Sequence, residues 1–294
     1  GLPKLPDPSD VCSCMDDRIF RKYCIDNFDI DDDGKISRAE AELVTAIDLT
    51  ESDVRSIRGI CYFSGLRKLT CRKCELLESA DLSDNRKIVS IGEFDFQYCS
   101  ALTSIVIPDE VTSIEDHAFH GCDNLTAFYG KYASNDRRCL VRDGELIAFA
   151  RKGLTRYAIP DGVTSIGNSV FLYCGALTSI KIPDSVTSIQ EFAFSLCIDL
   201  AAVDMPDGLT AIEEGAFLHC ESLTGIDIPA GVTSVGARAF FGCSALTGIF
   251  CKPNIPPSLG DMAFQYVNDA ARFYVPAASV DSYKAAEGWS YYAD

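Results

Sequence analysis

Apolar residues recur with a fixed spacing through most of the chain. From about residue 91, six cysteines occupy one position of a repeated pattern, separated by 23 residues in four of the five steps and by 52 in the other: Cys99, Cys122, Cys174, Cys197, Cys220 and Cys243. The pattern is L-x-x-I-x-I-P-x-x-V-x-x-I-x-x-x-A-F-x-x-C-x-x, and residues 177–199 fill all its specified positions. Apolar positions 4 and 6 predict a short strand with one buried face, which the proline at position 7 ends. Because one unit cannot bury its own apolar face, we expect stacked repeats with a shared core.

The run A-F-x-x-C-x-x-L-T-x-I-x-I-P, complete at residues 216–229, resembles the leucine-rich repeats of the BspA-like family of bacterial surface proteins. The resemblance covers roughly residues 55–294. It implies an α/β fold class: a β-rich, right-handed leucine-rich-repeat solenoid with a concave parallel sheet, a short helical N-terminal cap and a C-terminal capping helix. Residues 54–90 fit a shorter leucine-rich variant, in which Cys71 and Cys74 take template positions.

The fourteen cysteines divide into periodic and irregular ones. Stacking in parallel register does not favour the torsion of a disulfide, so the six periodic cysteines are predicted to be buried free thiols. Cys71 and Cys74 are predicted to be core thiols as well, rather than a zinc or redox motif. Cys12, Cys14 and Cys24 precede the repeats, and a disulfide from Cys24 to Cys12 or Cys14 is expected if the protein is secreted.

Residues 29–40 match the twelve-residue calcium loop of EF-hands along their full length. Carboxylates at loop positions 1, 3 and 5 supply hard oxygen ligands, a glycine permits the sharp turn, and a glutamate closes the site. The predicted Ca²⁺ ligands are Asp29, Asp31, Asp33, Lys35 through its carbonyl, Ser37 through water, and Glu40. An apolar stripe predicts a helix before the loop, and residues 41–47 are expected to form the exiting helix. A solvated acidic turn and a two-loop dockerin module are the less favoured alternatives, and a structural cap is favoured over a switch.

An insert interrupts the repeats between Leu125 and Leu154. Asp143-Gly144 between two alternating apolar runs predicts a hairpin with a type I′ turn. Residues 126–158 carry seven basic and three acidic side chains, so this segment is locally positive. Arg138 and Arg142 are therefore candidate binding residues, although a hairpin that fills a gap in the stack is an equal alternative.

These features divide the chain into four segments. Residues 1–53 are expected to form the N-terminal cap with the EF-hand-like loop, and residues 54–90 the shorter repeats. Residues 91–269 carry the 23-residue repeats, with a hairpin insert at 126–153. Residues 270–294 are expected to form the C-terminal cap, with a helix from Ala277 to Ala286 and Trp289 covering the last repeat.

Repeat position 5 should point outward from the sheet, and its side chains are the best candidates for a contact surface. Exposed aromatic residues are good anchors for a partner. The position-5 residues predicted to bind are Tyr129, Asp204, Asp227, Phe250 and Tyr274. Aromatic residues of a capping repeat that seal the stack are the alternative.

Charge and motifs exclude several classes of function. The formal net charge of −17 argues against a nucleic-acid partner, because neutralising phosphates supplies most of that affinity. The three histidines lie at different repeat positions, and no phosphate-binding loop or zinc-protease motif is present, so no enzyme is predicted. No run of about 20 apolar residues is present, so no membrane span is predicted in this chain.

Two hypotheses follow. The first is a non-catalytic extracellular binding or adhesion module; the resemblance implies a host extracellular-matrix or cell-surface protein, such as fibronectin or fibrinogen, as the partner. The second is a structural or scaffolding spacer in a bacterial surface complex. In either case we expect a monomer that is secreted or carried on the bacterial cell surface.

Overall fold

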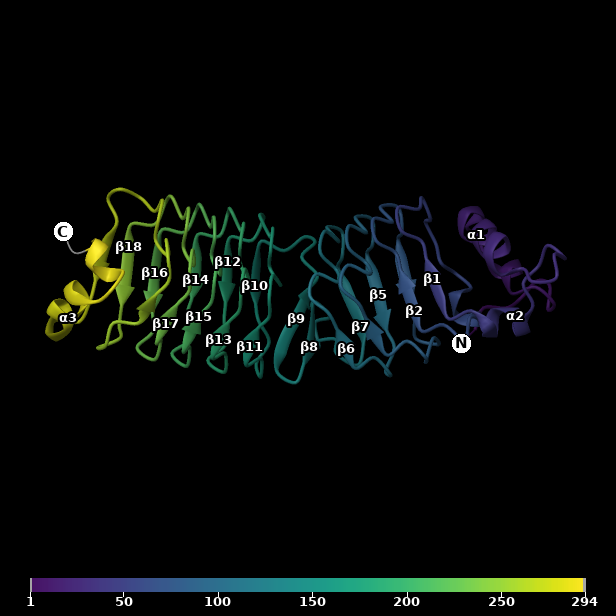
Figure 1. The fold of residues 1–294 in the computed structure, drawn as a ribbon, viewed down its shortest axis with the longest axis horizontal. Helices are drawn as coiled ribbons and strands as arrows, with labels where there is room; N and C mark the ends of the chain where they lie inside the picture. Colours follow the sequence, from purple (N-terminus) through teal and green to yellow (C-terminus); the bar gives the residue numbers. More distant parts are fainter. Residues whose placement is uncertain (1, 293–294) are drawn as a thin grey trace. The chain divides into compact units, whose positions relative to one another are not determined.

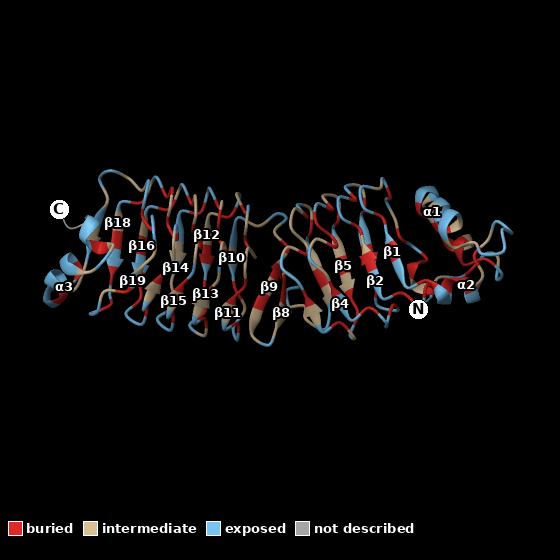
Figure 2. Ribbon diagram, viewed as in Figure 1, coloured by how far each residue is buried: buried red, intermediate tan, exposed pale blue. Residues whose placement is uncertain are grey.

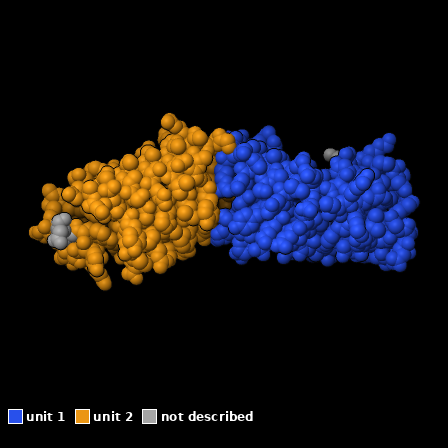
Figure 3. Space-filling view, turned by 90° about the horizontal axis from the view of Figure 1, so that it is seen from above, with its two compact units in different colours: residues 1–140, 150–152 blue, residues 141–149, 153–294 orange. Residues whose placement is uncertain are grey.

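The computed structural model describes residues 2–292, in two compact units (Figure 3). Unit 1 comprises residues 1–140 and 150–152, and unit 2 comprises residues 141–149 and 153–294. The boundary between the units divides only one of the four segments expected from the sequence, residues 91–269, and lies in its insert. No helix within residues 2–292 combines the length and the apolar character that crossing a membrane requires.

Unit 1 begins with three short helices: η1 (Val11–Cys14), α1 (Arg18–Phe28) and α2 (Arg38–Leu43). The Asp17 carboxylate accepts hydrogen bonds from two free amides of the first turn of α1. At α2, Ser37 and Glu40 form a reciprocal capping box. The helix expected over residues 41–47 therefore starts earlier than predicted and ends at Leu43. That part of the prediction is wrong because Ala46–Asp48 pairs as a strand with the following repeat.

The strands of unit 1 are short and parallel (Figure 1). A 3₁₀ helix, η2 (Ile60–Tyr62), lies between the first two of them. They form three sheets: β1 (Ala46–Asp48) with β2 (Lys68–Thr70), β3 (Ser79–Asp81) with β5 (Ser104–Ile107) and β7 (Ala127–Gly130), and β4 (Ser90–Ile91) with β6 (Ser113–Ile114).

Unit 2 repeats this design with two sets of strands (Figure 1). Strands from repeat positions 3–6 are β10 (Arg156–Ala158), β12 (Ser179–Lys181), β14 (Ala202–Asp204), β16 (Gly225–Ile228), β18 (Gly248–Cys251) and β20 (Arg272–Tyr274). The second set, two residues per repeat, is β11 (Ser165–Ile166), β13 (Ser188–Ile189), β15 (Ala211–Ile212), β17 (Ser234–Val235) and β19 (Ser258–Leu259). The first set forms two sheets, one of β10, β12 and β14 and one of β16, β18 and β20, whereas the second set lies in a single sheet. Neighbouring strands within each set pair in parallel, which confirms a β-solenoid with parallel sheets.

The insert forms the predicted hairpin from β8 (Cys139–Arg142) and β9 (Glu145–Phe149). Asp143 and Gly144 both have positive φ angles, of 51° and 84°, as a type I′ turn requires. Strand β9 then pairs in parallel with β11, with Leu146 opposite Ile166. The hairpin therefore supplies a strand to the second sheet of unit 2, which supports the gap-filling interpretation.

The core of unit 2 is built from columns of identical side chains, and buried residues recur in most of its repeats (Figure 2). Phe194, Phe217, Phe240 and Phe264 are fully buried, and successive rings stack with centroids 5.1–5.3 Å apart. These distances match the spacing of neighbouring strands in a sheet, about 4.8 Å, so the aromatic column follows the solenoid axis.

All fourteen cysteines are free, and all but Cys61 are buried. This agrees with the predicted thiol column. The disulfide expected near the N-terminus does not form. Cys12 and Cys24 are instead neighbouring thiols, whose hydrogen bond and burial raise the pKa of Cys24, and the Cys14 thiol donates to the Val11 carbonyl.

The C-terminal end carries η3 (Ala277–Ser279), α3 (Val280–Ala285) and η4 (Trp289–Tyr292). The expected helix over residues 277–286 is thus a single α-helical turn and a half preceded by a 3₁₀ turn. Trp289 is buried against Phe264 and Phe273, and its indole Nε1 donates to the Pro257 carbonyl at 2.7 Å. The indole therefore satisfies a carbonyl of the last repeat.

Candidate functional site

The predicted contact residues of unit 2 form a column on the outer surface of the sheet. Asp227, Phe250 and Tyr274 are aligned across β16, β18 and β20. All three are exposed, whereas the preceding residues Ile226 and Ile249 are buried. Alternation of side chains along a strand explains the difference, because successive residues point to opposite faces and position 4 points inward while position 5 points outward.

Phe250 and Tyr274 form a stacked aromatic pair on this surface. Their ring centroids lie 4.6 Å apart with an interplanar angle of 10°. The side chains remain 43% and 52% exposed, respectively. A Cβ atom at Gly248 would lie 3.0 Å from the Phe250 ring, so this glycine leaves room for the ring to lie over the sheet. The pair is thus an exposed apolar platform held by neighbouring strands.

An acidic hollow of about 350 Å³ adjoins Phe250. We call this hollow and the aromatic pair the sheet patch, and define it by Asp184, Asp204, Asp207, Asp227, Phe250, Lys252 and Tyr274. Lys252 pairs with Asp227 at 3.0 Å. Among residues 2–292, Asp184, Asp204 and Asp207 have no cationic partner. The hollow therefore keeps an excess of negative charge.

Sequence reasoning identified Asp204, Asp227, Phe250 and Tyr274 but missed the other three members of the patch. Asp184 and Asp207 both follow the proline that ends a strand, 23 residues apart. This recurring Pro-Asp pair was the available signal. Lys252 follows β18 directly, and only the fold shows that its ammonium reaches back to Asp227.

The candidate binding residues in and near the insert lie outside the sheet patch. The Arg137 guanidinium lies over the half-buried Tyr129 ring, 4.6 Å from its centroid. Arg138 donates through Nη1 to the carbonyls of Ala150 and Lys152. Arg142 is half-buried at the end of β8. The contacts of Arg138 are those of a residue that holds the insert together.

The EF-hand-like loop lies between α1 and α2, as the sequence predicts. Carboxylate oxygens of Asp29, Asp31 and Glu40 lie within 4.8 Å of one another. Asp29 accepts hydrogen bonds from the amides of Asp33 and Gly34, and Glu40 accepts from those of Ile30 and Ser37. Burial and then the nearby carboxylates raise the pKa of Asp31. The fold thus brings three of the six predicted ligands together.

Asp33, Lys35 and Ser37 make other contacts through their side chains. The Asp33 carboxylate accepts from the Lys35 amide, and the Ser37 hydroxyl caps α2. The Lys35 ammonium pairs with Asp7 at 3.0 Å, which is compatible with a ligand role for its carbonyl alone.

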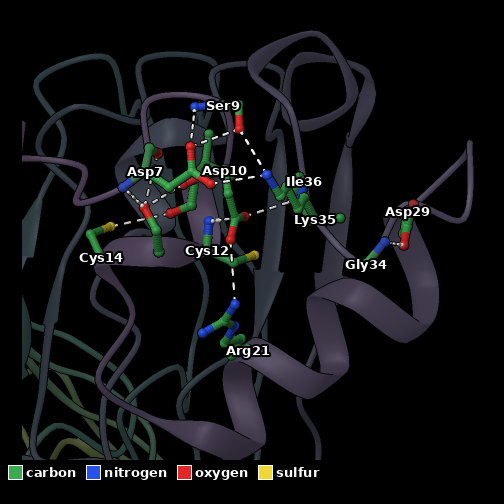
Figure 4. Close-up of polar contacts among 12 residues, drawn as sticks. Asp7, Ser9, Asp10, Cys12, Cys14, Arg21, Asp29, Gly34, Lys35 and Ile36 are labelled. Atoms are coloured by element: carbon green, nitrogen blue, oxygen red, sulfur yellow. Dashed lines mark hydrogen bonds and ion pairs between the residues drawn. The ribbon is translucent and has the colours of Figure 1, made fainter.

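The N-terminal segment holds this loop in place (Figure 4). The Ile36 carbonyl accepts from the Val11 amide at 2.7 Å, and the Ile36 amide donates to the buried Asp10 carboxylate at 3.2 Å. Asp10 also accepts from the Cys12 amide and pairs with Arg21. These bonds fix the conformation of the loop between the two helices.

Comparisons with known proteins agree with the repeat pattern. A model described as the BspA type leucine rich repeat region matches the sequence in six copies, over residues 64–134 and 146–271, which is more than half of the chain. No curated protein matches it significantly. The matched residues do not include the EF-hand-like loop.

Solved structures with the same fold come from bacterial proteins. A leucine rich cell surface protein of Faecalibacterium prausnitzii has a TM-score of 0.58 at 24% identity, over 89% of this chain and 74% of that one. The pneumococcal vaccine antigen PcpA has a TM-score of 0.50 at 16% identity, over 80% of this chain and 58% of that one. At these identities the likeness shows the fold.

Proposed function

Because this chain belongs to the BspA-type leucine-rich repeat family, we propose that it is a non-catalytic extracellular binding module that contacts a protein partner through the sheet patch. The observation that carries this proposal is the exposed Phe250–Tyr274 stack beside the acidic hollow. Solenoids bind through extended surfaces rather than deep pockets, and stacking of repeats places these side chains on one such surface.

The energetics of interfaces support this choice of surface. Large aromatic side chains dominate many interfaces because they bury much apolar area with few rotatable bonds. The stack already holds the two rings in one orientation, so less conformational entropy is lost when a partner covers them. The surrounding carboxylates would form a polar rim that selects the partner by charge.

The proposal includes a location and candidate partners. The F. prausnitzii relative is described as a leucine rich cell surface protein, which supports a place on or outside the bacterial cell for this module. We propose a host extracellular-matrix protein as the partner, with fibronectin and fibrinogen as the first candidates, and a monomeric module.

Binding to immobilised fibronectin and fibrinogen tests this proposal. The wild type is compared with the double variant Phe250→Ala plus Tyr274→Ala. We expect the wild type to bind one of them and the double variant to bind with an affinity at least about tenfold lower. Tyr173→Ala removes an equally exposed aromatic ring elsewhere on unit 2 and is the matched control. Retention of neither protein favours the scaffolding alternative, and equal binding by the double variant places the binding surface elsewhere.

We also propose that the loop at residues 29–40 binds Ca²⁺ and thereby stabilises the N-terminal segment of unit 1. Its support is the convergence of Asp29, Asp31 and Glu40 between two helices that are already formed. Carboxylate oxygens suit a hard cation, which would also neutralise the repulsion among them. Ca²⁺ would supply no reaction chemistry here, only stability.

Calorimetry with the chain tests the calcium proposal. We expect Ca²⁺ to bind and to raise the unfolding temperature of the wild type, because a ligand that binds only the folded state stabilises it. Asp29→Ala plus Glu40→Ala should abolish both effects. Asp32→Asn removes one charge from the same loop at a position that supplies no predicted ligand, so binding should persist. No heat of binding, or a melting temperature that a chelator does not change, contradicts the proposal.

A further inference from the structure

We propose that the acidic hollow of the sheet patch accepts an arginine side chain from a basic segment of the partner, with the guanidinium against Phe250 and its donors directed at Asp204 and Asp227. This inference rests on the proposed function, and it names the chemistry that the partner must present. Three features of the chain support it: the negative charge around the hollow, the presence of an aromatic ring beside carboxylates, and an arginine that lies over an aromatic ring within unit 1.

The charge of this region favours a cationic ligand. Residues 184–294 contain fourteen acidic and four basic residues. One of the four, Lys252, already lies in the hollow and pairs with Asp227 at 3.0 Å. This pair shows that the hollow admits a cationic side chain at hydrogen-bonding distance. Asp184, Asp204 and Asp207 leave room for further positive charge.

The side chains around the hollow favour arginine over lysine. A guanidinium is planar, stacks on an aromatic face and donates to carboxylates at the same time, whereas an ammonium is a compact and strongly hydrated charge. Phe250 supplies an aromatic face and also lines the hollow that contains Asp204 and Asp227. Few residue types other than arginine satisfy both surfaces at once.

The chain contains an arginine contact of this kind elsewhere. Tyr129 occupies the same repeat position as Phe250 and Tyr274, and the Arg137 guanidinium lies 4.6 Å from its ring centroid. An aromatic residue at repeat position 5 therefore does hold a guanidinium on the sheet surface. Phe250 and Tyr274 each cover one face of the other ring, and both side chains remain exposed, so a partner can still reach the pair.

A neutral glycan is the main competing ligand, because aromatic platforms also stack on sugar rings. The carboxylates of the hollow favour an arginine over a neutral glycan. Binding a neutral ligand would cover Asp204 and Asp207 without supplying a compensating charge, and covering an unpaired charge is costly. An arginine offsets that cost with its own charge.

A blocked five-residue peptide, Gly-Arg-Gly-Arg-Gly, tests the inference by calorimetry with the full chain at low and at physiological salt. We expect a Kd below about 1 mM at low salt and weaker binding as salt rises. The analogue with citrulline in place of both arginines keeps the shape and loses the charge, and it should bind at least about tenfold more weakly. The lysine analogue should lie between them.

Variants locate the site. Asp204→Asn, Asp227→Asn and Phe250→Ala should each weaken peptide binding by about fivefold to tenfold, whereas Asp199→Asn, which removes an exposed charge outside the patch, should change it by less than about twofold. Unchanged melting curves would exclude misfolding. The inference is overturned if the citrulline peptide binds as tightly as the arginine peptide, or if Asp199→Asn weakens binding as much as the patch variants do. It is also overturned if the neutral glycan cellohexaose binds more tightly than the arginine peptide, or if the arginine peptide does not bind with a Kd below about 1 mM. If the wild type still retains fibronectin or fibrinogen through Phe250 and Tyr274 in that case, the proposed function stands and only the arginine specificity fails.

Discussion

The thiol of Cys243 donates a hydrogen bond to the backbone carbonyl of Phe217 on the preceding repeat, at 3.1 Å. The same bond joins Cys220 to Phe194 and Cys197 to Phe171. The Phe217 carbonyl also accepts from the Cys220 amide within its own turn, at 3.2 Å. The thiol therefore adds a second hydrogen bond that joins neighbouring repeats, in addition to filling space as a small apolar side chain. Burial raises the pKa of Cys243 to about 12, so the thiol keeps its proton and stays a donor.

Replacing this thiol should reduce stability measurably. We expect Cys243→Ala to lower the free energy of unfolding by about 1–2 kcal/mol, because it removes the donor and leaves a small void. Equilibrium unfolding in urea measures the change. Ser244→Ala, at the exposed neighbouring position, should change it by less than about 0.5 kcal/mol. A Cys243→Ala protein as stable as the wild type would show that the hydrogen bond has no net value.

The phenylalanine column should be more sensitive. Phe217 is fully buried and stacks on Phe194 and on Phe240. Phe217→Ala should cost about 3–5 kcal/mol, because the rings on both sides lose a partner and the solenoid cannot collapse around the void. Phe217→Leu keeps most of the volume and should cost distinctly less. Equal losses from the two variants, measured by urea unfolding, would mean that ring stacking and not volume dominates.

The N-terminal segment should lose stability in acid. Hydrogen bonds from the Ser9 hydroxyl and amide, together with Lys35, lower the pKa of Asp7 to about 2. The unfolded state, with a pKa near 3.9, binds this proton more tightly. The stabilisation from Asp7 is therefore complete above about pH 4 and disappears as the pH falls towards 2.

Melting temperatures of the wild type and Asp7→Asn isolate this effect. The wild type should melt higher at pH 6, and the difference between the two proteins should shrink to zero near pH 2. A difference that does not depend on pH would show that Asp7 stabilises the segment without its charge.

Arg138 should stabilise the insert without contributing to binding. Arg138→Met removes the two hydrogen bonds to the carbonyls of Ala150 and Lys152 while keeping the length of the side chain. We expect a loss of about 1 kcal/mol, faster amide exchange over residues 139–150, and unchanged affinity for the partner. Lost affinity with unchanged exchange would assign Arg138 to a binding surface instead.

The sequence predicts those parts of the fold that depend on spacing within one repeat. The alternation around Ile226 and Ile249 predicts that both are buried in strands, and Asp143-Gly144 predicts a tight turn. Each prediction depends only on residues that are close together in the sequence. The pairing of β9 with β11 depends on which strand edge the stacked repeats leave unpaired. No pattern within one repeat predicts this edge. The end of α2 at Leu43 likewise depends on the pairing of β1 with β2 rather than on helix propensity.

The candidate site was also predictable only in those features that depend on one strand. The alternation along a strand places Asp227, Phe250 and Tyr274 outward. The aromatic stack, however, also needs the space left by Gly248, and the hollow needs the turns that carry Asp184 and Asp207. These relations cross repeats, and the donation from Cys243 to Phe217 does so as well. Periodicity shows which residues recur, and only the register between strands shows what each one touches.

Hydrogen–deuterium exchange on the complex tests the central claim most directly. The protein would be bound to whichever of fibronectin and fibrinogen it retains, and the amides that gain protection would be mapped along the chain. We predict new protection at the ends of β14, β16, β18 and β20, around Asp204, Asp227, Phe250 and Tyr274. New protection confined to the insert at residues 126–153, or to the loop at residues 29–40, would contradict a partner bound at the sheet patch.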